Sequence, residues 1–98
     1  MPKAKEESNI DVVSKNNGPN PLKVLGRNGV YSILLSLHDE PLGFSQLMFK
    51  TQLNPAILDR HLKALMELNL IDKNKKYNLT PKGERVLTLL NELLKTVR

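Results

Sequence analysis

Apolar residues and proline positions divide the chain into short helical segments. Asn20-Pro21 and Asn54-Pro55 each place a capping residue directly before proline, a common start of a helix. Between residues 30 and 37, and again between 58 and 65, apolar residues recur at intervals of three and four, as on one face of a helix. The pattern predicts helices over 21–25, 44–51 and 55–68. It also predicts one that Asn28 caps and that ends at His38–Pro41.

A hairpin and a last helix follow. The segments 70–73 and 76–79 are strand candidates around a tight turn at Asn74-Lys75, with Ile71, Tyr77 and Leu79 able to pack inward. Thr80-Pro81 then caps and opens a helix that runs almost to residue 98. This order predicts a mainly α fold with a small β-hairpin (α+β): a winged helix-turn-helix with an extended C-terminal helix.

The charge distribution separates a tail from a basic domain. In residues 1–19, three lysines balance three acidic residues, and few apolar residues precede a closing Asn-Asn-Gly-Pro, so we expect a flexible N-terminal tail. The net charge of +5 therefore lies on residues 20–98. We assign 20–80 to the winged domain and 81–98 to a C-terminal dimerisation helix packed on it. The basic charge indicates a polyanionic partner.

The segment 44–68 has the layout of a helix-turn-helix, whose second helix enters the DNA major groove. On that helix Leu58, Leu62 and Leu65 form a stripe for the core. The opposite face exposes groups that donate to guanine edges or phosphates, or approach thymine methyls. This face carries Ala56, Arg60, Lys63 and Glu67, is flanked by Ile57, Asp59 and Ala64, and has His61 at its edge. The alternative is an ordinary amphipathic helix with a solvated charged face.

Two neighbouring elements add candidate contacts. Lys73, Lys75 and Lys76 surround the hairpin tip, as in a wing that reaches phosphates or the adjacent minor groove. The first helix of the pair offers Ser45, Gln46 and Lys50, which can hold a phosphate oxygen near a helix start. For the hairpin, the alternative is a solubilising turn. For the first helix, it is ordinary exposed surface.

Four motifs, in order, resemble the winged-helix bacterial and archaeal regulators of the ArsR, MarR and HxlR kind. PLKVLGRNGVYSILLSL is similar to the opening of their domain, and PLGFSQL to the strand-and-helix entry. ILDRHLKALMELNLI resembles the recognition helix with its exit, and YNLTPKGERVL the second wing strand with the following cap. Together they span Pro21 to Leu87.

The resemblance implies which residues contact the groove: Asn54, Ala56, Ile57, Arg60, His61 and Lys63. This chain departs from the family pattern in a short wing, in Asn69 where glycine is usual, and in lacking a visible sensor, since it has no cysteine and two histidines. We expect His38 in a loop, and His61 as a DNA-facing or capping residue instead of a metal ligand.

The last helix carries more apolar surface than one domain needs. Val86, Leu87 and Leu90 suffice to pack on the domain, so the remaining apolar residues would be exposed in a monomer. We expect them to form a dimer interface, made by Leu89, Leu93, Leu94 and Val97. The alternative is packing against the chain's own first helix or tail.

Several functions are excluded or left open. The absence of cysteine excludes disulfides and thiolate zinc sites. No nucleophile–base set, metal constellation or phosphate-binding glycine loop is present, so no enzyme, metal or cofactor is predicted. Without a signal peptide or a long apolar run, we expect a soluble cytoplasmic protein. The sequence favours a homodimeric regulator of double-stranded DNA and leaves open whether a small-molecule effector exists. An architectural DNA-binding protein and a protein-interaction module are the alternatives.

Overall fold

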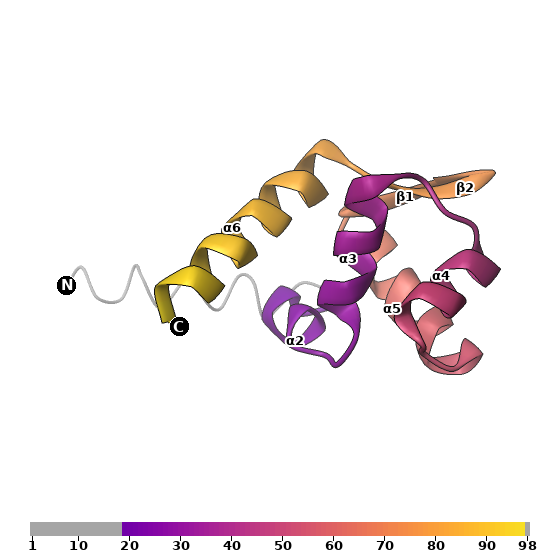
Figure 1. Cartoon of the computed structure of the whole chain (residues 1–98), viewed down its shortest axis with the longest axis horizontal. Helices are drawn as coiled ribbons and strands as arrows, with labels where there is room; N and C mark the ends of the chain where they lie inside the picture. The colour runs from indigo at the N-terminus through magenta and orange to yellow at the C-terminus, as the bar shows by residue number, and fades with distance from the viewer. Residues whose placement is uncertain (1–18, 98) are drawn as a thin grey trace.

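The computed structural model describes residues 19–97, and the predicted tail lies outside them apart from Pro19. Figure 1 shows the order α2 (Pro21–Leu25), α3 (Val30–Asp39), α4 (Phe44–Thr51), α5 (Pro55–Glu67), β1 (Ile71–Asn74), β2 (Lys76–Leu79) and α6 (Pro81–Val97). The predicted helices, hairpin and order are confirmed, with bounds shifted by one or two residues. None of the helices in this range is long and apolar enough to span a membrane.

The helix starts follow from local chemistry, with one exception. The Asn20 side chain accepts hydrogen bonds from the backbone N–H groups of Leu22 and Lys23 at the start of α2, as predicted. Asn28 was expected to cap α3 and does not. The N-cap is Gly29, whose φ of 96° lies in the left-handed region that glycine adopts without strain.

One aliphatic core joins α3, α4, α5 and the hairpin. On the strand side, Ile71 and Tyr77 close this core. Its centre consists of fully buried side chains from the three helices: Ile33, Leu34, Leu47, Leu58, Leu62 and Leu65. Burying each such aliphatic side chain contributes about 1.5–3 kcal/mol. The predicted leucine stripe of α5 is therefore confirmed as core, and it fixes which face of α5 turns outward.

The hairpin is tied to the segment that precedes α4. β1 and β2 pair antiparallel, with Asn74 opposite Lys76 and Lys75 alone at the tip at a φ of 74°. Leu42 forms a bridge to β2: its N–H donates to the Tyr77 carbonyl at 3.1 Å, and the Tyr77 N–H donates back at 2.8 Å. The bridge attaches the hairpin to the start of the helix-turn-helix.

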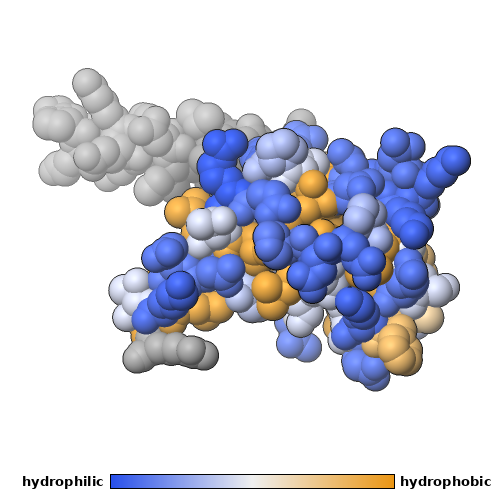
Figure 2. Space-filling model, turned by 45° about the horizontal axis from the view of Figure 1, so that its top comes forward, coloured by the Kyte–Doolittle hydropathy of each residue, from blue (hydrophilic) through white to orange (hydrophobic). Residues whose placement is uncertain are grey.

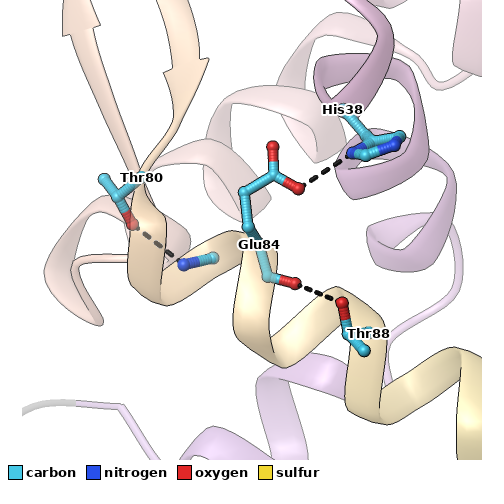
Figure 3. A network of polar contacts seen from close by, with 5 residues as sticks. His38, Thr80, Glu84 and Thr88 are labelled. Atoms are coloured by element: carbon cyan, nitrogen blue, oxygen red, sulfur yellow. Dashed lines mark hydrogen bonds and ion pairs between the residues drawn. The ribbon is translucent and has the colours of Figure 1, made fainter.

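The start of α6 is held by side-chain contacts that Figure 3 shows. The Thr80 hydroxyl accepts from the Gly83 N–H at 3.0 Å and donates to the Asn69 carbonyl at 2.7 Å. His38 Nδ1 lies 2.8 Å from a carboxylate oxygen of Glu84. The expectation that His38 lies in a loop is wrong, because it lies in the last turn of α3. Glu84 therefore connects the start of α6 to the end of α3.

Candidate nucleic-acid interface

The helix-turn-helix is formed by α4, a turn at residues 52–54, and α5. Gln52 ends α4 in the left-handed region with a φ of 60°, and its N–H donates to the Met48 carbonyl at 2.9 Å. The Asn54 side chain accepts the Ile57 N–H at 2.9 Å and so caps α5. These contacts fix the angle between the helices, because both ends of the turn are satisfied locally.

The outward face of α5 carries most of the predicted contact residues. Ala56, Arg60 and Lys63 are exposed, and Ile57 is half-buried beside them. Lys63 forms an ion pair with Asp59 at 3.0 Å, one helical turn away and open to solvent. Exposed pairs of this kind contribute under about 1 kcal/mol, so a phosphate can compete for the ammonium. Ala64, expected beside this face, is instead buried.

His61 was expected at the DNA-facing edge, and this prediction is wrong. Its ring is only 5% exposed, because α2 and the loop after it pack against α5. Nε2 lies 3.0 Å from the Asn28 carbonyl, so Nε2 carries a proton and donates. Nδ1 is buried without a hydrogen-bond partner among residues 19–97. The ring connects the recognition helix to the loop before α3.

The charge state of His61 follows from this environment. Burial lowers the pKa of the ring below its ordinary value, and the Arg27 and Arg60 charges lower that pKa further. The hydrogen bond to the Asn28 carbonyl opposes them by favouring the protonated ring. The neutral form therefore prevails near pH 7, and His61 adds no positive charge to the surface.

The three wing lysines all lie exposed around the hairpin tip. Lys73 Nζ lies 5.1 Å from the centroid of the Tyr77 ring, a cation–π contact that holds its stem against the strand. Lys75 and Lys76 form no ion pair with an acidic residue among residues 19–97. The tip is thus a local concentration of positive charge on a short hairpin.

The residues of α4 divide into exposed and engaged groups. Ser45 and Lys50 are exposed. The Gln46 side-chain oxygen accepts the Gly43 N–H at 2.8 Å, which leaves its amide N–H groups as the available donors. The sequence interpretation missed Phe49, which is 78% exposed next to them. Its spacing was the available signal, since at about 100° per residue it lies about 140° around the helix from Phe44.

A second residue that the sequence interpretation missed is Arg27. It lies in the loop between α2 and α3, and it lines a cavity beside α5 together with Arg60 and His61. No spacing rule relates residue 27 to residue 60. A basic side chain within a Gly-Arg-Asn-Gly loop was the one available hint.

The described residues include no cluster of side chains that could hold a metal ion. Residues 19–97 contain no group of three or more metal-ligating side chains, and His38 with Glu84 is a pair only.

The last helix extends away from this interface. In Figure 1 the hairpin and the α4–α5 pair lie at one end of the molecule, and the C-terminal end of α6 points to the other. Figure 2 shows hydrophobic surface beside that end of α6. It is formed by large side chains that were expected to be exposed and are 43–70% exposed: Leu89, Leu93, Leu94 and Val97.

Comparisons with known proteins connect this geometry to a family. The model of the bacterial regulatory proteins of the arsR family matches residues 29–73, from the start of α3 into β1. A helix-turn-helix transcriptional regulator of Methanocaldococcus jannaschii is 31% identical over 80 residues, which cover 71% of this chain and 75% of that protein. Reduced HlyU from Vibrio cholerae has the same fold, with a TM-score of 0.63 at 22% identity over 95% of this chain and 97% of that one.

These matches confirm the resemblance to winged-helix regulators and select one of the three kinds. The residues that match the family model, 29–73, include the whole helix-turn-helix formed by α4 and α5. The chain belongs to the ArsR family of helix-turn-helix DNA-binding transcriptional regulators, which are not enzymes.

Proposed function

We propose that this chain binds particular double-stranded DNA sites as a homodimer, with α5 in the major groove and the β1–β2 hairpin against the phosphate backbone or the adjacent minor groove. One observation carries the proposal: α5 and the hairpin lie at the same end of the molecule (Figure 1), and Arg60 on α5 and the lysines at the hairpin tip are exposed. This is the arrangement in which a recognition helix and a wing meet one DNA duplex.

The two elements have different roles in this binding mode. Arg60 can donate two parallel hydrogen bonds to a guanine edge, and Ala56 leaves room for close approach to a base pair. The wing lysines are point charges on flexible stems, suited to phosphates. Asn54, Ile57 and Lys63 border the Arg60 face and complete the proposed groove contacts.

The dimer is supported by the apolar side of α6. If a twofold partner covered the 56% of Leu93 that is exposed, burial would contribute about 1–1.5 kcal/mol per copy, or about 2–3 kcal/mol per dimer. Leu89, Leu94 and Val97 would add comparable amounts. A twofold dimer places its recognition helices about one DNA turn or a multiple apart, so the site would be roughly palindromic.

The first experiment selects bound fragments from a genomic DNA library and measures affinity against salt. Arg60→Ala is expected to lose about 1–3 kcal/mol of discrimination at one position of each half-site. Lys75→Ala is expected to weaken all sequences alike and to reduce the salt slope by about 0.9. The control is Lys95→Ala, at the other end of α6. Uniform binding without discrete sites would indicate an architectural role, and no binding at low salt a protein-interaction module.

The second experiment measures the mass of the chain by light scattering at micromolar concentration. We expect a dimer, and we expect Leu93→Glu to give a monomer because it buries a charge in the apolar interface. Thr88→Glu is the matched control, since it adds the same charge on the exposed polar side of the same helix. A monomeric wild-type chain would refute the dimer and leave the DNA-binding mode to be judged separately.

A further inference from the structure

A cavity lies between the loop before α3 and the first turns of α5. It has a volume of about 560 Å³ and is lined by two arginines, Arg27 and Arg60, by the buried His61, and by the amides of Asn28, Gln52 and Asn54. Leu53 and Ile57 form its apolar wall. Six polar side chains and an open mouth distinguish it from a packing defect, which would be apolar and closed.

Both arginines are available to an anion. Within residues 19–97 neither guanidinium makes an ion pair, and no acidic side chain lines the cavity. The nearest acidic residue along α5, Asp59, is engaged with Lys63. Two arginines line this cavity without an acidic side chain beside them, and a tetrahedral oxyanion can accept bidentate hydrogen bonds from such groups.

The backbone adds to the same field. The cavity adjoins the N-terminus of α5, a helix of 13 residues whose macrodipole is positive at this end. The Asn54 side-chain oxygen already accepts the Ile57 N–H, so the amide N–H groups of Asn54 remain as donors.

His61 gives an independent indication of how the cavity is built. It is nine-tenths buried, lines the cavity, and has an unpartnered Nδ1. Its hydrogen bond to the Asn28 carbonyl holds the loop that carries Arg27 against the helix that carries Arg60. The two arginines come from segments 33 residues apart, and this one bond fixes their relation.

We propose that this cavity binds a phosphate group, with the guanidinium group of Arg27 as its principal ligand and His61 as a positioning residue. The guanidinium group of Arg60 is a second ligand of a free phosphate, and on DNA it is the guanine contact proposed above. The phosphate has two possible sources, the DNA backbone or a free phosphate-bearing molecule. A helix in the major groove has backbone phosphates along both of its sides, and the cavity adjoins the groove-facing part of α5. The DNA source rests on the proposed function above, whereas the free source does not.

The first arm of the test uses the full chain without DNA. Inorganic phosphate and then pyrophosphate are titrated at constant ionic strength, and the arginine Nε–Hε signals are followed by NMR. Saturable shifts of the Arg27 and Arg60 signals are expected if a free phosphate enters, with Arg85 on the outer side of α6 unaffected. In Arg27→Gln the Arg60 shift should be reduced. Sodium chloride at matched ionic strength controls for charge screening.

The second arm measures DNA binding against salt for Arg27→Ala, Arg27→Gln and the control Arg85→Ala. Loss of one phosphate contact reduces the slope by about 0.9, which corresponds to about an eight-fold weaker affinity at 0.1 M salt, equal for all sequences. Arg85→Ala should leave the slope unchanged. His61→Gln should reproduce the slope change, which a purely stabilising role would not do.

The outcomes separate the sources and the two proposals. A changed slope without saturable shifts assigns the cavity to the DNA backbone, and saturable shifts with an unchanged slope assign it to a free phosphate. If the wild-type chain binds DNA but neither arm responds to Arg27, the cavity proposal is overturned and the proposed function stands. If the wild-type chain binds no DNA, the proposed function fails and the phosphate titration alone decides the cavity.

Discussion

Gly83 is the position at which the fold is least tolerant of one added carbon atom. A Cβ there would lie 2.0 Å from the Leu70 carbonyl oxygen, 2.9 Å from Leu79 Cδ1 and 3.0 Å from the Leu70 carbonyl carbon. Real Cβ atoms essentially never come within 3.0 Å of such atoms, so α6 and the α5–β1 connection must separate by about 1 Å. Neither backbone can rotate away as a side chain can.

The expected cost of Gly83→Ala follows from this distance. Overpacking against backbone costs about 3 kcal/mol, at the upper end of the usual range, and the better helix propensity of alanine returns about 1 kcal/mol. We expect a net loss of about 2 kcal/mol in the free energy of unfolding. For a domain of this size that lowers Tm by about 8–16 °C.

The assay is thermal unfolding followed by circular dichroism, with all variants at one protein concentration because a dimer's Tm depends on it. Gly43→Ala is the matched control: its Cβ would meet only the Gln46 side-chain oxygen, at an ordinary 3.7 Å, and should cost under about 1 kcal/mol. A Gly83→Ala variant that melts together with Gly43→Ala would refute the close approach.

Three further outcomes are expected. The free energy of unfolding should have its full value above pH 6.5 and decrease at lower pH, by at most about 1.4 kcal/mol per pH unit, because His61 binds a proton in the unfolded chain more readily than in the folded one. Urea titrations from pH 7.5 to 5.5 measure this decrease. The same pH dependence of the unfolding free energy in His61→Gln would contradict the prediction. Thr80→Ala should cost about 1–2 kcal/mol in the free energy of unfolding by urea, since the hydroxyl both caps α6 and donates to the Asn69 carbonyl. Thr80→Ser should keep most of this stability. Equal losses in the two variants would disprove the cap. Tyr31→Phe removes the hydroxyl that donates to the Asn91 side chain and should cost about 1 kcal/mol in the same assay; wild-type stability would show that the contact contributes nothing.

Local chemistry made most of the fold predictable. The caps at Asn20, Asn54 and Thr80 are contacts within three residues, so the sequence alone contains them. The leucine stripe of α5 and the excess apolar face of α6 follow from helical periodicity, which needs no knowledge of the partner. The left-handed Asn69, with a φ of 62°, was likewise readable from its place after a helix.

Apart from the Asn28 cap and the place of His38 at the end of α3, the errors concern contacts between distant segments. Periodicity gives the direction of a buried face but not its width, which depends on what packs there. Because α2 and its following loop cover α5, the buried arc extends to His61 and Ala64. The bridge from Leu42 to Tyr77 and the meeting of Arg27 with Arg60 join residues more than 30 positions apart. Such pairings leave no periodic trace in a single sequence.

The Leu42–Tyr77 bridge has a mechanical consequence for DNA recognition. Two backbone hydrogen bonds join the hairpin to the entry to α4, and so they restrain the distance between the recognition helix and the wing. A duplex whose groove does not match that distance must deform, and bending a site of about 20–30 base pairs costs about 1–6 kcal/mol depending on its sequence. Under the proposed binding mode, the chain therefore selects flexible base steps at positions that none of its side chains touch.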